Sequence, residues 1–107
     1  MSSKFLGVNV VRAANIYFEG NVTSRSIEFS DGELKTLGIM LPGQYTFNTD
    51  KPELMEIQAG SVKYRLSGSD DWVRIEAGGN FNVPGKSAFD IEVLEVTDYC
   101  CSFLDSK

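Results

Sequence analysis

The stretch "GGNFNVPGKSAFDIEV", from Gly78 to Val93, predicts two β-strands joined by a sharp turn. Pro84-Gly85 marks the turn, because proline fixes one backbone angle and glycine tolerates left-handed conformations. After the turn, Phe89, Ile91 and Val93 alternate with acidic residues. A period of two places these apolar side chains on one face of a strand, so we expect that face to line a core.

The same pattern continues through most of the chain. Short runs of alternating apolar and polar residues are separated by turn residues such as Asp31-Gly32 and Pro42-Gly43. Turns every ~8–12 residues, without a convincing helical period, are typical of β-sandwiches and barrels. We therefore predict an all-β, single-domain protein with a β-barrel over residues 15–107. Residues 1–14 are expected to be an N-terminal extension, and their pattern leaves open a short helix, an edge strand or an arm that crosses to a partner.

The overall composition restricts the classes of partner. The 107 residues suit one domain, and a hydrophobic content of 42% with 7 Phe, 4 Tyr and 1 Trp is ample for a core. A net charge of −5, spread along the chain, disfavours binding to nucleic acid or to an anionic membrane surface. No apolar run approaches the roughly 20 residues that span a bilayer. Gly7 and Asn9 interrupt the first apolar patch, which makes it a poor signal peptide.

The two cysteines, Cys100 and Cys101, are adjacent. Neighbouring residues of a strand point to opposite faces, so a disulfide between them would be strained. We therefore expect two reduced thiols and a cytoplasmic protein.

Two spacings indicate a particular kind of barrel. Six residues separate Glu53 from Gly60, and five separate Gly78 from Pro84. Both spacings resemble the two motifs of the cupins, which are small jelly-roll barrels. The resemblance implies a cupin-type jelly-roll fold for this chain.

The metal ligands of that fold are missing here. In metal-binding cupins the two motifs carry three histidines and a glutamate, a set that suits a transition metal. This chain contains no histidine; residues 45–49 occupy the region of the first histidines, and Phe89 stands at the later position. Only Glu53 remains of the ligand set, and one carboxylate does not hold such a metal tightly. We therefore predict no metal site.

Four separate blocks of sequence resemble one family more closely. They are "YFEGNV" (17–22), "GQYTFNTDKPELMEIQAG" (43–60), "DW" (71–72) and "EAGGNFNVPGKSAF" (76–89). In this order and spacing they resemble the pyrimidine/purine nucleoside phosphorylase family. The resemblance implies a homodimeric pentosyltransferase that cleaves purine and pyrimidine nucleosides with phosphate to free base and ribose 1-phosphate. It also implies inorganic phosphate as a co-substrate and no other cofactor.

The chain departs from that family at three positions. Lys86 and Asp90 stand where the family can have histidines, and Ser102 stands near an expected arginine. If a histidine is an essential acid, these departures favour an alternative function, that of a metal-free cupin that binds a small molecule without catalysis. A third hypothesis is an interaction domain whose barrel is filled by its own side chains.

Phosphorolysis needs a cationic or amide-rich cradle for phosphate. We assign this role to Lys86 and Ser87, because the amides after Pro84-Gly85 can form a nest for an anion. Arg65 and Arg74 are rival cations, since an arginine that faces the lumen would need an anionic partner. The competing interpretation for each of these residues is an ordinary solvent-facing side chain.

The base and the sugar need an aromatic slot. The candidates for it are Tyr45, Phe47 and Phe89, whose rings would stack on a planar base. The alternative is that these aromatic residues only fill the core of a small barrel.

The reaction also needs a group that stabilises the charge on the departing base. The candidates for this catalytic role are Glu53, Asn82 and Asp90, together with the hydroxyl of Tyr45. Asn82 can donate to and accept from a base edge. Glu53 can act as an acid if burial raises its pKa, whereas a solvated position in the loop after Pro52 is the competing interpretation.

Overall fold

The computed structural model describes residues 3–104, and within them the chain forms β-strands and one short 3-10 turn. The elements are β1 (Asn9–Val10), β2 (Asn15–Tyr17), η1 (Phe18–Gly20), β3 (Val22–Glu28), β4 (Leu34–Met40), β5 (Gly43–Asn48), β6 (Glu53–Ala59), β7 (Ser61–Leu66), β8 (Val73–Glu76), β9 (Asn80–Val83), β10 (Ala88–Val93) and β11 (Thr97–Phe103). In this part of the chain the structure contains no helix long and apolar enough to span a membrane.

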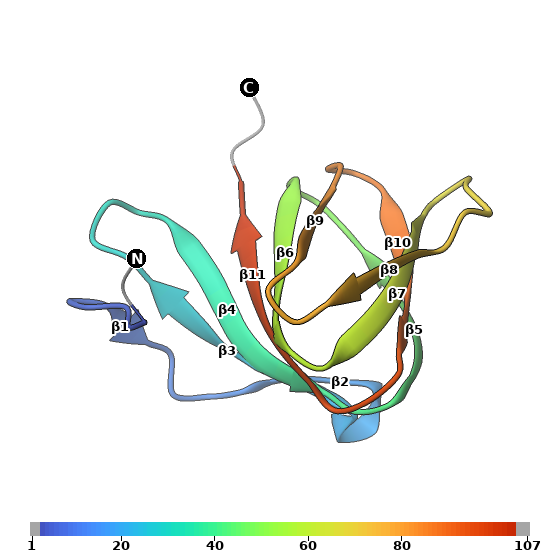
Figure 1. The fold of residues 1–107 in the computed structure, drawn as a ribbon. Coiled ribbons are helices and arrows are strands. Elements are labelled where there is room, and N and C mark those ends of the chain that lie inside the picture. Colours follow the sequence, from blue (N-terminus) through green and yellow to red (C-terminus); the bar gives the residue numbers. More distant parts are fainter. Residues whose placement is uncertain (1–2, 105–107) are drawn as a thin grey trace.

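The strands form two antiparallel sheets that pack face to face (Figure 1). The first sheet has seven strands in the order β1-β3-β4-β11-β6-β9, with β2 also paired to β3. The second sheet has four strands in the order β5-β10-β7-β8. This arrangement confirms the predicted all-β, cupin-type jelly roll.

The predicted turns are of two kinds: Asp31-Gly32 closes a hairpin between β3 and β4 of the first sheet, whereas the others join the two sheets. The turns at Pro42-Gly43, Gly60, Gly78-Gly79 and Pro84-Gly85 each join a strand of one sheet to a strand of the other. The stretch 78–93 thus contributes β9 to the first sheet and β10 to the second. These crossings place the two sheets on opposite sides of a common interior.

Gly60 makes the shortest of these crossings, because it alone separates β6 from β7. Its φ of +95° lies in the left-handed region, which glycine adopts without steric cost. A Cβ at this position would lie 2.6 Å from the carbonyl oxygen of Val96 and 2.8 Å from Cα of Thr97. Only glycine therefore fits this turn without movement of the β10–β11 connection.

The core lies between the sheets and follows the alternation of the strands. Phe89, Ile91 and Val93 of β10 are buried, as the period of two predicts, and their acidic neighbours face outward. Residues without solvent contact come from both sheets, among them Val22, Met40, Ile57, Val62 and Val83. Cys100 and Cys101 are buried and free of any disulfide, as expected.

The segment before β2 contains one of the three structures that its sequence left open. Asn9–Val10 forms an edge strand, with Asn9 opposite Glu28 and Val10 opposite Ile27 of β3. Residues 1 and 2 lie outside the described part of the chain. The edge strand extends the first sheet next to β2.

Candidate functional site

A cavity of about 180 Å³, here called the lumen, lies between the two sheets. Its lining residues are Tyr17, Ser24, Thr36, Met40, Phe47, Asn48, Glu53, Met55, Phe89, Tyr99, Cys101 and Phe103. They come from β2, β3, β4, β5, β6, β10 and β11, so the lumen exists only when both sheets have assembled. Its lining is mainly apolar, with a few polar groups, which is typical of a small-molecule site.

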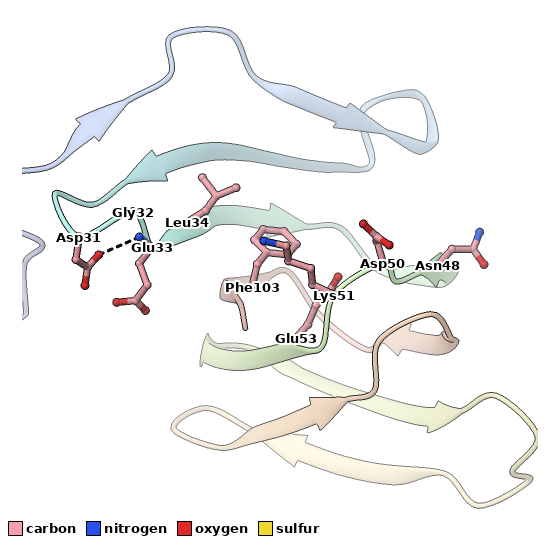
Figure 2. A pocket seen from close by; sticks show the side chains of 9 residues that line it. All are labelled: Asp31, Gly32, Glu33, Leu34, Asn48, Asp50, Lys51, Glu53 and Phe103. Carbon is pink, nitrogen blue, oxygen red and sulfur yellow. Dashed lines mark hydrogen bonds between the residues drawn. The ribbon is translucent and has the colours of Figure 1, made fainter. Parts of the chain in front are cut away.

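A wider hollow of about 590 Å³, here called the mouth, adjoins the lumen (Figure 2). The mouth and the lumen share Asn48, Glu53 and Phe103 as lining residues. The rest of the mouth is formed by the β3–β4 turn and the loop before β6, through Asp31, Gly32, Glu33, Leu34, Asp50 and Lys51. Among the described residues that line the mouth, Lys51 carries the only positive charge, beside four carboxyl groups.

Phe47 and Phe89 form one wall of the lumen. Their rings are stacked with centroids 5.6 Å apart, and Phe89 also meets the edge of Phe81 at 5.9 Å. Phe89 is only 2% exposed, whereas Phe47 is half-buried. The structure therefore brings two of the three predicted aromatic residues to the lumen.

Tyr45, the third aromatic candidate, has a different position. Its hydroxyl donates a hydrogen bond to the carbonyl oxygen of Leu41, with 2.7 Å between the two oxygens. Its ring contacts Phe18, and the side chain is buried without lining the lumen. This hydrogen bond ties the start of β5 to the end of β4.

Glu53 stands where the lumen meets the mouth. It begins β6 and lies opposite Phe103 of β11 and Val83 of β9. Its Oε1 lies 3.5 Å from Sγ of Cys101, and the thiol is the donor. Burial raises the pKa of the Glu53 carboxyl above its usual value of 4.5, although the bond from Cys101 opposes the shift. The carboxyl group thus keeps its proton to a higher pH than a solvated carboxyl group does.

Two other ionisable groups of the lumen also hold their protons more firmly than in water. Burial raises the pKa of the Tyr99 hydroxyl, and burial together with Glu53 raises the pKa of the Cys101 thiol. Ser24 and Thr36 are buried hydroxyls, and Ser24 accepts a hydrogen bond from the side-chain amide of Asn15 at 3.2 Å. Neutral hydroxyls can both donate and accept hydrogen bonds, which suits varied ligands.

The turn that contains Lys86 packs against the loop at the mouth. The amide of Lys86 donates to the carbonyl oxygen of Asp50 at 3.0 Å, and the amide of Ser87 donates to Oγ1 of Thr49 at 3.0 Å. Both amides that the sequence suggested as an anion nest are therefore engaged within the chain. The Lys86 side chain is exposed and lines neither the mouth nor the lumen.

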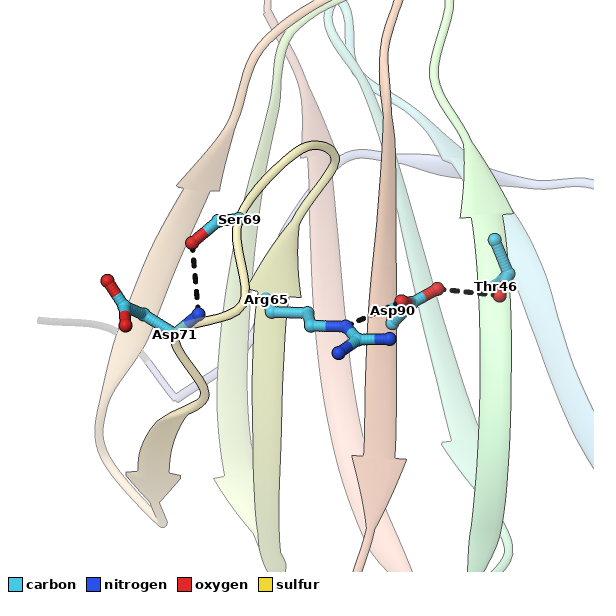
Figure 3. Close-up of polar contacts among 5 residues, drawn as sticks. All are labelled: Thr46, Arg65, Ser69, Asp71 and Asp90. Atoms are coloured by element: carbon cyan, nitrogen blue, oxygen red, sulfur yellow. Dashed lines mark hydrogen bonds and ion pairs between the residues drawn. The ribbon is translucent and has the colours of Figure 1, made fainter.

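Arg65 and Asp90 lie on the outer face of the second sheet (Figure 3). Nε of Arg65 is 2.8 Å from Oδ2 of Asp90, and Thr46 donates to Oδ1 of Asp90 at 2.7 Å. Bonds from Thr46 and then Arg65 lower the pKa of Asp90. The Arg65 guanidinium also lies 4.6 Å from the ring centre of Trp72. The row of contacts is separated from the lumen by the sheet itself.

Two further candidates also face away from the lumen. Arg74 on β8 forms an exposed ion pair with Glu76. Asn82 on β9 is exposed, while Phe81 and Val83 on either side of it are buried. The structure therefore separates Arg65, Arg74, Asn82 and Asp90 from Glu53, Phe47 and Phe89, because adjacent residues of a strand point to opposite faces.

Three residues that line the lumen were not predicted from the sequence. Tyr99, Cys101 and Phe103 occupy every second position of β11 and all face the lumen. That alternation was visible, but it did not show that β11 lies at the centre of the first sheet. Within residues 3–104, no three Cys, Asp or Glu side chains are grouped so that they could hold a metal ion.

Residues 12–103 match the model of the pyrimidine/purine nucleoside phosphorylase family. The chain belongs to this family. It is 57% identical over 102 residues to a Geobacter metallireducens protein of that name. The alignment covers 95% of this chain and 98% of the relative. It is similarly 48% identical over 105 residues to a Leptospira interrogans protein of the same name, with 98% of this chain and 99% of the relative covered.

Two solved structures are also similar to this member of the phosphorylase family. A crystal structure of a protein of unknown function from Acinetobacter sp. ADP1 superposes with a TM-score of 0.92 at 41% identity, over 96% of this chain and all of the other. One from Vibrio parahaemolyticus, also of unknown function, has a TM-score of 0.83 at 35% identity, over 90% and 99% of the two chains. These likenesses support the jelly-roll architecture of the family member described above.

Proposed function

We propose that this chain is a metal-independent nucleoside phosphorylase, which cleaves purine and pyrimidine nucleosides with phosphate to free base and ribose 1-phosphate. The observation that carries the proposal is the lumen of a phosphorylase family member, in which an aromatic wall stands beside a carboxyl group with a raised pKa. No histidine is present to supply the acid instead.

The size of the cavity suggests how a nucleoside is divided between lumen and mouth. The lumen measures about 180 Å³, less than the roughly 300–1,000 Å³ of common ligand pockets. A flat base would enter it against Phe47 and Phe89, and the ribose would lie in the mouth. The glycosidic bond between base and ribose would then lie near Glu53, which lines both the lumen and the mouth.

The chemistry of the lumen supports broad specificity. Stacking on an aromatic face is available to every base, because each base has a π-face. Hydroxyl groups such as those of Ser24 and Thr36 can turn to donate to one base edge or accept from another. Purines and pyrimidines would therefore be bound by the same wall without a fixed pattern of donors and acceptors.

The proposed reaction is an exchange of one bond for another. A phosphate oxygen attacks C1′ of the ribose, the bond between C1′ and the base nitrogen breaks, and its electron pair leaves with the base. Protonated Glu53 gives its proton to the departing base and is reprotonated by the phosphate or by solvent. General acid catalysis of this kind contributes about 10²- to 10⁴-fold to a rate.

The phosphate requires a cation at the rim of a predominantly acidic mouth. Lys86 remains our candidate, because its turn packs on the loop that contains Asp50 and Lys51. Lys51 is the rival, since it lines the mouth itself. The four carboxyl groups nearby oppose the binding of a dianion, so a cation is needed to hold it.

The first test is chromatographic. Purified protein is incubated with a panel of purine and pyrimidine nucleosides, with and without phosphate, and the free base is measured. Release that depends on phosphate supports the proposal. Release without phosphate indicates a hydrolase, and no release from any nucleoside by folded protein refutes the proposed activity.

The acidic mouth favours one alternative, a metal-free cupin that binds a nucleoside without cleaving it. Such a protein would be stabilised against heat by the nucleoside, because a ligand that binds only the native state raises its apparent stability. Phosphate would then have no effect on the nucleoside. Intact nucleoside after long incubation, together with a raised melting temperature, would select this alternative.

We further propose that the protein is a cytoplasmic homodimer. Two free buried thiols are consistent with a reducing compartment. The outer strands β1 and β2 expose apolar side chains, with Val10 at 55% and Ile16 at 68% exposure, and a twofold partner would cover them. Size-exclusion chromatography with light scattering tests this assembly, and a monomer mass would refute it.

A further inference from the structure

The connection between β2 and β3 has an unusual backbone. Phe18, Glu19 and Gly20 follow one another with φ values of 51°, 58° and 94°, all in the left-handed region. Only glycine adopts this region without steric cost, so the first two residues are strained. Strained backbone of this kind persists where the surrounding structure requires a particular side-chain placement.

Two aromatic side chains at the junction of β2 and the strained turn lie against β5. The ring of Phe18 lies 4.9 Å from that of Tyr45 and 5.3 Å from that of Phe47. The ring of Tyr17, the residue before the turn, meets Phe47 edge-on at 6.0 Å. Tyr17 also lines the lumen, so this pair connects the turn to the stacked wall of Phe47 and Phe89.

These ring contacts occur between two sheet edges. β2 pairs only with β3 at the border of the first sheet, and β5 pairs only with β10 at the border of the second. In Figure 1 the light-blue turn after β2 lies beside the start of β5. The ring of Tyr17 therefore lies on a side of the lumen that no ladder of backbone hydrogen bonds closes, and the ring of Phe18 packs on the same Phe47.

Packing alone does not account for this placement. Tyr17 and Phe18 are 43% and 42% exposed, whereas the aromatic residues that fill the core, such as Phe81 and Phe89, are almost completely buried. Two large rings, one at the end of β2 and one on the strained turn, thus remain partly exposed beside the cavity. An aromatic surface of this kind is suited to a planar ring that arrives from solution.

We propose that Tyr17 forms a side wall of the base-binding site, with its ring in contact with the nucleobase. Phe18 is a positioning residue, because it holds the turn against Tyr45 and Phe47 and does not itself line the lumen. The ligand class is a planar heteroaromatic ring, free or in a nucleoside. The inference rests on the proposed function for its kinetic test, but not for its binding test.

The test compares Tyr17→Ala, Tyr17→Phe and Phe18→Ala with a matched control, Phe5→Ala. Phe5 is 39% exposed and packs on Phe29 at 5.0 Å, and it lines neither the lumen nor the mouth. The nucleoside Kd is measured by isothermal titration calorimetry, and the KM values for nucleoside and phosphate are measured separately. Circular dichroism and the melting temperature confirm that each variant is folded, and Tyr17→Leu replaces Tyr17→Ala if the latter does not fold.

We expect Tyr17→Ala to raise the nucleoside Kd and KM by about 5- to 150-fold, the range that corresponds to loss of one base–aromatic stack. The phosphate KM should stay within about twofold, since the lost contact is to the base alone. Tyr17→Phe should bind like the wild type, and Phe18→Ala should weaken nucleoside binding less than Tyr17→Ala does. A folded Tyr17→Ala or Tyr17→Leu variant that binds nucleoside as tightly as Phe5→Ala does would overturn the proposal.

The two proposals fail in different ways. If the wild-type protein binds nucleoside but releases no base with phosphate, the proposed function is wrong and the side wall is judged by the Kd values alone. If cleavage occurs and Tyr17→Ala leaves the nucleoside KM unchanged, the side wall is wrong and the function stands. If the wild-type protein binds neither free bases nor nucleosides, both are refuted.

Discussion

The carboxylate of Glu53 accepts a hydrogen bond from the thiol of Cys101, with 3.5 Å between Oε1 and Sγ. The two residues lie on the neighbouring strands β6 and β11, and both side chains line the lumen. Burial raises the pKa of each group, so each keeps its proton to a higher pH than it does in water. A candidate acid is thus held beside a weak, uncharged donor.

The first prediction concerns stability and pH. Because the pKa of Glu53 is raised in the folded state, the folded protein binds its proton more tightly than the unfolded chain does, and this contribution is lost as pH rises from 4.5 through the raised value. We expect Glu53→Gln to be more stable than the wild type at neutral pH, with the difference vanishing at acidic pH. Urea unfolding over the range from about pH 4 to about pH 8 measures it. A difference that instead grows toward acidic pH would show that the pKa of Glu53 is lowered.

The second prediction concerns the hydrogen bond itself. The thiol of Cys101 favours the ionised form of Glu53, so Cys101→Ala should raise the pKa of Glu53 further. If Glu53 is the acid, the alkaline limb of the kcat/KM profile should move to higher pH. Cys100→Ala is the matched control. Cys100 is buried like Cys101, but the hydrogen bond to Glu53 comes from Cys101. If the two variants have the same pH profile of kcat/KM, the alkaline limb does not report the pKa of Glu53.

The third prediction distinguishes the two lysines at the rim. Removal of the phosphate ligand raises the phosphate KM while the nucleoside KM changes little, because the lost contact is to one substrate. We expect this result for Lys86→Gln, with a smaller effect for Lys51→Gln. Lys63→Gln, on the outward-facing part of β7, controls for the loss of one positive charge. A larger effect for Lys51→Gln than for Lys86→Gln would assign the phosphate to Lys51.

The fourth prediction separates the core and binding roles of the stacked rings. Phe89 is almost completely buried between Phe47 and Phe81, so Phe89→Ala should destabilise the protein by about 3–5 kcal/mol. Phe47 is half-buried, so Phe47→Ala should cost less stability and raise the nucleoside KM. Chemical denaturation and steady-state kinetics measure the two effects. If Phe47→Ala binds nucleoside normally, the aromatic wall is only part of the core.

The fifth prediction tests the one-residue crossing at Gly60. Gly60 and Gly68 both have left-handed φ values, of 95° and 82°, but a Cβ at Gly68 would meet nothing within 4 Å. Gly68→Ala should therefore cost about 1–2 kcal/mol from backbone strain alone. Gly60→Ala should cost clearly more, because the backbone near Thr97 must move as well. Equal losses of stability in the two variants would mean that the β10–β11 connection yields easily.

The sequence pattern predicted the strands well because the inside and outside of a sheet alternate along the chain. The alternation through Phe89, Ile91 and Val93 corresponds to β10, and the turns at Pro42-Gly43 and Pro84-Gly85 correspond to crossings between the sheets. The pattern also contained the reason why Asp90 faces outward, since it adjoins two buried residues. What local pattern does not contain is which distant strands become neighbours.

The composition of the site depended on that missing information. Tyr17 near the start of the chain, Phe47 in the middle and Cys101 near the end meet in one cavity, although no local motif connects them. The proposed anion nest at Lys86 and Ser87 also required knowledge of distant partners. Its amides are engaged by the loop at Asp50, which a turn motif alone does not reveal.

The position of β11 affects how the chain folds while it is being synthesised. This strand, the last in the described part of the chain, lies between β4 and β6, and both are synthesised before it. Until β11 emerges from the ribosome, two long strand edges have no partner, and exposed edges of this kind promote aggregation. A nascent chain without Thr97–Phe103 is therefore a natural client for chaperones, and premature termination just before this strand should yield insoluble product.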